Sequence, residues 1–368
     1  MITERNASLA NTANWIIVFV FLLATLIYFD TFLKGFAIAI LIWYLIKKLR
    51  DTIAKIKIGK IKLPKWLITA TSTITVFLIL YLIIQIIASN LQKLIVDIHL
   101  YRDHIKDALV ALEGLIGTKE DISTSFVHLF DQYKNEIIGY AGSFAGAIGK
   151  SLMIVIYVIF LLLEESLFNL KIKKTLNMTS RGATIHKIGT AITLLFDRYL
   201  SVKTFTSFLT GILSYFILLI LGVELAALWA FLIFLFNFIP TIGSIVATAF
   251  PGLFALVQFG TLNMFFTVLA CVGIVQLLVG NLVEPRIMGE RLNISPMVVL
   301  LGLTLWGFIW GVTGMLLSIP ITSTLIIVFS QFEDTRAIAI MLSKNGEIGI
   351  IDQPEDSIDP EGTTSKDS

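Results

Sequence analysis

The sequence predicts an all-α polytopic membrane protein with about eight membrane segments, and three observations lead to this fold class. Of the 368 residues, 56% are apolar and only 15% are charged, whereas soluble proteins carry about 45–50% apolar and about 25% charged residues. Apolar runs of about 20 residues, the length of a membrane-spanning helix, recur along the chain. In the C-terminal half, the stretches Leu225–Val283 and Leu292–Phe332 contain no Asp, Glu, Lys or Arg.

Residues 1–88 are expected to hold three spans, which lie at 15–28, 36–46 and 66–88. We interpret the first as a retained helix, because it lacks the flanks of a signal peptide. The loop 47–65 carries eight Lys or Arg residues against one acid. By the positive-inside rule, this loop and the N-terminus face the cytoplasm. Such a basic loop can also bind anionic lipid head groups.

Residues 89–139 are predicted to form a helical extracytoplasmic insert, because their apolar residues recur every three or four positions. The histidines of this insert fit no metal-ligand spacing, so we expect no metal there. Residues 140–203 are expected to hold a fourth span and then an amphipathic cytoplasmic helix on the membrane face. Seven basic residues against three acidic ones support the cytoplasmic side for 164–203.

Residues 204–332 are the predicted transport core, in which two apolar runs are interrupted. The run 225–258 is interrupted from Asn237 to Gly243, and the run 296–329 by three glycines near its middle. Proline and glycine interrupt helices, and the resulting pieces are short for a full crossing. We therefore predict two re-entrant hairpins, although eight plain crossings remain an alternative. The acidic tail, 333–368, is predicted to be disordered and cytoplasmic.

Paired breaks in membrane helices point to a transport path, because half-helix ends and unwound carbonyls offer dipoles to a solute or ion. The alternative is that these residues only pack helices together. The candidate path residues of the two breaks are Asn237, Pro240, Thr241, Gly243, Gly307, Gly311, Thr313 and Gly314. The prolines expected to act as hinges or structural residues are Pro251, Pro285, Pro296 and Pro320.

A short polar joint, Asn281–Pro296, connects the two uncharged stretches. If the preceding helix continues into it, Asn281 and Glu284 lie on one face, three residues apart, until Pro285 ends the helix. Together with Gln276 they form a polar cluster, which predicts a solute or cation contact at a gate, with Glu284 as a proton carrier. The alternative is an interfacial carboxylate that pairs with Arg286 or Arg291.

Catalysis has little support in the sequence. We find no phosphate-binding glycine loop, no metal-ligand spacing and no nucleophile motif. The protein is therefore not expected to be an enzyme or to need a cofactor, and no nucleic-acid partner is expected.

The late motifs resemble those of the autoinducer-2 exporter family of bacterial inner-membrane permeases. They comprise Asp197-Arg-Tyr-Leu, Gly222, Asn237-Phe-Ile-Pro-Thr-Ile-Gly243, Pro251, the joint Asn281–Pro296, Gly307-x-x-x-Gly-x-x-Gly314 and Pro320. The resemblance covers nearly the whole chain. It implies a permease of the inner membrane that forms a homo-oligomer, with a pentamer as the candidate assembly. Members have been assigned export of autoinducer-2, and others sodium(lithium)/proton antiport.

Three functional hypotheses follow. The leading one is export of a small polar solute, autoinducer-2, by a permease whose other partners are membrane lipids. The second is antiport of a monovalent cation against protons through Glu284. The third is a non-transporting membrane scaffold or receptor.

Overall fold

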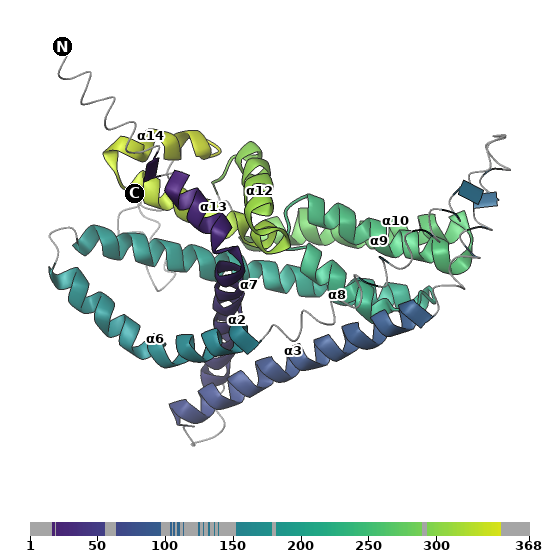
Figure 1. Cartoon of the computed structure of the whole chain (residues 1–368), viewed down its shortest axis with the longest axis horizontal. Coiled ribbons are helices and arrows are strands. Elements are labelled where there is room, and N and C mark those ends of the chain that lie inside the picture. Colours follow the sequence, from purple (N-terminus) through teal and green to yellow (C-terminus); the bar gives the residue numbers. More distant parts are fainter. Residues whose placement is uncertain are drawn as a thin grey trace, which may run out of the picture.

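The protein is described by a computed structural model (Figure 1). The described residues are 17–18, 20–55, 64–96, 152–178, 182–288 and 293–346, with isolated positions between 104 and 139. All regular structure in these residues is helical. Five of the described helices are long and apolar enough to span a membrane, or six if a bent N-terminal pair is counted as one span. Most of the predicted external insert and the end of the tail lie outside the described residues.

The N-terminal helices form a small bundle around α2. Helix α2, Asp30–Lys55, follows the helix Val20–Tyr28 at a bend of 80°. It contacts α3, Lys65–Val96, and α6, Leu152–Met178. The predicted loop 47–65 is wrong in its first half, because α2 continues through the basic residues to Lys55. Likewise, α3 extends eight residues beyond the predicted span end at Ala88.

Helix α7, Gly182–Ile220, is the central element of the fold. At about 1.5 Å per residue, its 39 residues give a rod about 58 Å long. It contacts α6, α8, α10, α11 and α13, and it runs through the middle of the molecule (Figure 1). We predicted a surface helix ending near Lys203 and a separate span beginning at Thr204. This boundary is wrong, because no proline lies between them and the helix runs through without a break.

Helices α8, Ala226–Phe236, and α9, Ile242–Phe259, form an antiparallel hairpin around the predicted break at Asn237–Gly243. The end of α9 returns to the start of α8, where the Gln258 side chain accepts from the Glu224 backbone N–H and donates to the Gly222 carbonyl, at 2.7 and 2.9 Å. In the turn, Thr241 has a φ of 58°. A Cβ at Gly243 would lie 1.8 Å from the Phe236 carbonyl oxygen, so only glycine fits there.

Helices α12, Pro296–Trp310, and α13, Val312–Ser330, form a second hairpin. The chain reverses at Gly311, whose φ is 61°. A Cβ at Gly314 would lie 1.8 Å from the Trp306 carbonyl oxygen, which explains the need for glycine on α13. The predicted break is therefore confirmed as a break in the helix. Pro296 starts α12, whereas Pro251 and Pro320 lie inside α9 and α13 as buried residues.

A further helix, α14, Glu333–Leu342, packs on α13. The Ser295 backbone N–H donates to the Leu342 carbonyl at 3.1 Å, so α14 closes against the start of α12. The prediction of disorder from residue 333 onward was wrong for these ten residues, which form a helix that contacts α13 and buries Ala339.

The joint begins as a helix and not as a break. Helix α10, Leu262–Leu278, passes through a π-helical turn, Val279–Val283, into α11, Glu284–Met288. The prediction that Pro285 ends the helix was therefore wrong. In the π turn the Glu284 backbone N–H bonds to the Val279 carbonyl, five residues back. This wider turn lets the helix pass a proline that has no N–H to donate.

Candidate functional site

A line of buried polar side chains runs along α7. The residues recur at intervals of three and four, so they share one face of the helix. They are Lys203, Thr206, Ser207, Thr210 and Ser214, and each is buried. In a helix whose other residues are mostly apolar, this polar face is directed into the protein and away from the surrounding membrane.

Lys203 and Glu284 form an ion pair between α7 and α11. The Lys203 Nζ lies 2.7 Å from Glu284 Oε1 and 2.9 Å from Oε2. Only 8% of Lys203 is exposed. The Thr206 hydroxyl donates to Oε2 at 3.4 Å. The two opposite charges leave the site with no net charge. Because the pair is largely shielded from water, removing either partner would leave the other charge uncompensated.

The first break joins the same polar face. Asn237, at the end of α8, is buried, and its Nδ2 donates to the Ser207 hydroxyl at 3.2 Å. Ser207 lies about one helical turn after Lys203. The turn between α8 and α9 is thereby attached to α7 next to the ion pair. We call Lys203, Thr206, Ser207, Asn237 and Glu284 the polar site.

Four buried polar groups in α7, α8 and α10 have no hydrogen-bond partner among the described residues. They are the Tyr199 and Ser214 hydroxyls on α7, Nε1 of Trp229 on α8, and Nε2 of Gln276 on α10. Tyr199 lies one turn before Lys203, and Gln276 two turns before Glu284. Buried polar groups are nearly always hydrogen-bonded, so these groups are positioned to bond water or a polar solute.

The second break, between α12 and α13, forms no hydrogen bond with the polar site among the described residues. Gly307 and Gly314 pack the α12–α13 hairpin, while Gly311 is exposed at its turn and Thr313 is half-buried. Among the described residues, no hydrogen bond joins these four to Glu284. The buried Ser318, Ser323 and Ser330 of α13 donate to carbonyls of their own helix.

The structure separates the other predicted site residues. Asn281 is exposed on the π turn and does not join Glu284, because the wider turn changes the faces on which the two residues lie. Thr241 is exposed at the tip of the α8–α9 turn, and Pro240 beside it is half-buried. The alternative partner Arg286 does not bind Glu284, whose partner is Lys203. Arg291 lies outside the described residues.

A second group of charges connects α7 to α2 and α2 to α6. The Tyr44 hydroxyl lies 2.8 Å from Asp197 Oδ1, and Lys48 Nζ lies 3.2 Å from both Asp197 carboxylate oxygens. Arg50 forms a bidentate pair with Glu165, at 2.6 and 2.9 Å. These contacts fix the N-terminal helices to the start of the core.

Comparison with known proteins gives a consistent result. The profile described as AI-2E family transporter matches residues 16–334. The chain belongs to the AI-2E transporter family. It is therefore an integral inner-membrane protein from a family of transport proteins, and its spans are membrane helices.

Relatives of this AI-2E family member carry transport names. The AI-2 transport protein TqsA of Escherichia coli is 30% identical over 77% of this chain and 82% of the relative. A Haemophilus influenzae protein named "Putative transport protein" is 30% identical over 76% of this chain and 82% of the relative. A protein of the same name from Borreliella burgdorferi is 35% identical, but the match spans only 56% of each chain.

Sequence reasoning missed most of the polar site of this AI-2E family member. In the sequence, Lys203 is one of several basic residues of a predicted cytoplasmic segment, and Thr206 and Ser207 lie in a predicted apolar span. The available signal was the spacing of polar residues from Tyr199 to Ser214 within one helix. Glu284 and Asn237 were found because a carboxylate and an amide stand out in uncharged stretches.

Proposed function

We propose that this chain is a permease that exports a small, uncharged polar solute, autoinducer-2, across the inner membrane. The observation that carries this proposal is the polar site, where a helix break meets a buried ion pair of zero net charge. A neutral polyhydroxylated solute needs hydrogen-bond partners and no counter-ion. The family resemblance and the name of the TqsA relative support autoinducer-2 as the solute.

In this proposal the hairpins α8–α9 and α12–α13 are re-entrant segments that move against the other helices. At about 1.5 Å per residue, the 11 residues of α8 extend about 17 Å, roughly half of a 30 Å hydrocarbon core. The contact of Gln258 with Gly222 supports a return of the chain to the side that it left. Both termini are then cytoplasmic, and the working form is a homo-oligomer, for which a pentamer is the candidate.

The test is the intracellular level of labelled autoinducer-2 in cells that lack or express the protein. Expression should lower that level, and Asn237→Ala should abolish most of the effect. Losing one buried hydrogen bond costs about 1–3 kcal/mol, which corresponds to a change of about fivefold to more than a hundredfold. Asn90→Ala is the control, because Asn90 is only half-buried on α3 and its side chain donates to the Ile86 carbonyl of its own helix. Equal levels with and without the protein would contradict this substrate.

A second candidate function, sodium(lithium)/proton antiport, is favoured by one observation, the carboxylate of Glu284, whose side chain is only 18% exposed. In this mechanism Glu284 alternates between the Lys203 ammonium and a proton or cation. Glu284→Gln should then abolish cation-driven proton flux in everted vesicles while the protein remains in the membrane. Unchanged flux in the variant, or no cation-driven flux in the unmodified protein, would exclude this mechanism.

A further inference from the structure

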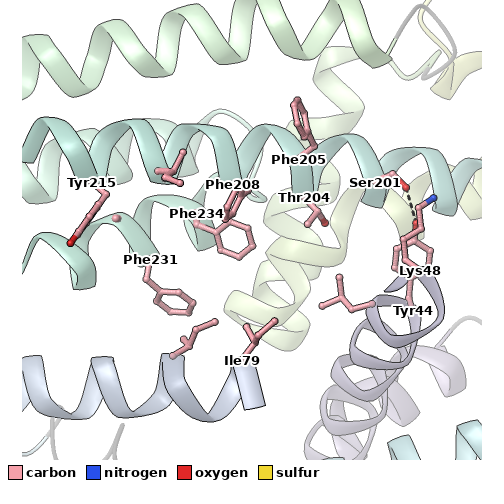
Figure 2. A pocket seen from close by; sticks show the side chains of 15 residues that line it. Tyr44, Lys48, Ile79, Ser201, Thr204, Phe205, Phe208, Tyr215, Phe231 and Phe234 are labelled. Atoms are coloured by element: carbon pink, nitrogen blue, oxygen red, sulfur yellow. Dashed lines mark hydrogen bonds between the residues drawn. The ribbon is translucent and has the colours of Figure 1, made fainter. Parts of the chain in front are cut away.

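A groove on the outside of α7 lies between α2, α3 and α8, with a cavity volume of about 660 Å³ (Figure 2). We call it the α3–α7–α8 groove. It uses a different face of α7 from the polar site, because its α7 residues run from Ser201 through Phe208 to Tyr215. Its wall is almost entirely apolar, so a polar solute would gain no hydrogen bonds along most of its length.

The groove is open to the membrane phase. Phe205 and Phe208 of α7 and Ile79 of α3 line it and are about half exposed. Gly211 allows the close approach of α8 that forms the floor, since a Cβ there would lie 3.0 Å from the Ala230 carbonyl oxygen. In a membrane, an exposed apolar groove of this kind is occupied by lipid acyl chains, which are as apolar as its side chains.

Polar groups are concentrated at one end of the groove. Tyr44, Lys48 and Ser201 line this end, and the hydroxyls of Tyr44 and Ser201 lie 2.9 Å apart (Figure 2). Lys48 is paired with Asp197, yet about half of its side chain is exposed. Lys47 lies next to it above the ring of Trp43, and Arg50 follows, paired with Glu165. Lys47 adds a positive charge and Asp51, whose carboxylate lies 3.8 Å from Arg50 Nε, adds a negative one. The cation that the groove itself presents is therefore the exposed half of Lys48.

The groove is long enough to hold an acyl chain of one membrane leaflet. From Ser201 to Tyr215, 14 steps along α7 at about 1.5 Å each give about 21 Å. Half of the hydrocarbon core is about 15 Å, so a lipid whose head group lies beside Lys48 would place its acyl chain along the apolar wall. Basic groups between helices at the cytoplasmic side bind anionic lipid head groups.

We infer that the α3–α7–α8 groove binds one anionic phospholipid, with its acyl chain between α3, α7 and α8 and its phosphate beside Lys48, Tyr44 and Ser201. This lipid would lie against the α7 helix that also carries Lys203, but on another face. The inference does not depend on which solute the protein transports.

The experiment is native mass spectrometry of the full chain, released from detergent after incubation with phosphatidylglycerol or with phosphatidylcholine of the same acyl chains. The unmodified protein should retain one phosphatidylglycerol per chain in preference to phosphatidylcholine. Lys48→Gln should lower this preference by about fivefold, the effect of one lysine at a membrane surface. Ile212→Trp, which fills the groove, should lower the retention of both lipids.

Two matched controls separate this site from general lipid contact. Lys93→Gln removes another exposed lysine, which lies on α3 outside the groove and pairs with Glu224. Leu219→Trp adds the same indole ring at an exposed position of α7 outside the groove. Neither should alter retention. The inference would be overturned if Lys48→Gln retained the full preference for phosphatidylglycerol over phosphatidylcholine. It would also be overturned if a second copy of the chain, and not lipid, were found to cover Phe205 and Phe208. If Ile212→Trp does not fold, Lys48→Gln still decides the result.

Discussion

Lys203 and Glu284 are each acceptable within the core only because the other is present. Removing one partner of a buried ion pair leaves an uncompensated charge, which costs about 3–5 kcal/mol, whereas replacing both with apolar residues is often neutral. The Lys48–Asp197 pair contrasts with it, since about half of each side chain is exposed. Exposed pairs contribute only about 0–1 kcal/mol.

Lys203→Ala should therefore lower the thermal stability of the purified protein strongly, and the double change Lys203→Met with Glu284→Leu should restore most of it. The measurement is the fraction of protein that stays monodisperse in detergent after heating. Lys48→Ala serves as the control and should have little effect. A double variant as unstable as the single one would show that the pair does more than neutralise charge.

Gly243 and Gly314, near the starts of α9 and α13, have the tightest surroundings of the described glycines. Gly243→Ala and Gly314→Ala would each place a methyl group 1.8 Å from a backbone oxygen, so both hairpins must open. Each change should destabilise the protein by at least the roughly 1–3 kcal/mol typical of overpacking. Gly189→Ala on α7 is the control, because nothing lies within 4 Å of its added Cβ. Equal stability of all three variants would contradict the hairpin geometry.

At the scale of elements, the π turn Val279–Val283 sets the direction in which Glu284 points. One residue more or less in a helix rotates all later side chains by about 100°. The π turn contains one residue more than an α-helical turn needs, and π turns are frequent at functional sites. The turn thereby aligns Glu284 with Lys203 while the helix passes Pro285.

Deletion of Gly280 should convert the π turn to an α-helical one and rotate Glu284 away from α7. Transport should fall to the level of Glu284→Ala, although Glu284 is still present. A short bifunctional thiol reagent should link cysteines placed at 203 and 284, in a Cys271→Ser background, only when Gly280 is retained. Pro285→Ala should keep the link. Efficient linking after the deletion would show that the π turn has no role in this alignment.

At the scale of the whole molecule, two arrangements of the chain place the polar joint on opposite sides of the membrane. With re-entrant hairpins, Gly260 is outside and Asn293 is in the cytoplasm. With eight plain crossings, the two positions exchange sides. The antiparallel packing of α8 and α9 favours the first arrangement, because it brings the end of α9 back to Gly222.

Single cysteines at 260 and at 293, in the Cys271→Ser background, test this arrangement. A membrane-impermeant maleimide applied to intact cells should label the cysteine at 260, and the cysteine at 293 should react only in everted vesicles. The reverse pattern would support eight plain crossings. A cysteine at Trp66, expected at the cytoplasmic end of α3, is the orientation control.

Much of the helix framework could be predicted from the sequence, because prolines and glycines in long apolar runs mark the breaks at Asn237–Gly243 and Gly311. The continuity of α7 could not be predicted, since a charge count separates Lys203 from the span that follows it although both belong to one helix. The π turn before Pro285 could not be predicted either, because one extra residue does not visibly change the hydrophobic pattern of an apolar run. The partner of Glu284 lies 81 residues away along the chain, beyond any local periodicity.

The same separation has a consequence for biosynthesis. Lys203 leaves the ribosome 81 residues before Glu284. At about 5–20 residues per second, its ammonium group waits roughly 4–16 s for its carboxylate. During that interval, the lysine is stable only at the membrane surface or inside the insertion machinery. We therefore expect the ion pair to close only after α10 and α11 have been made, so the core of this transporter is completed from its C-terminal side.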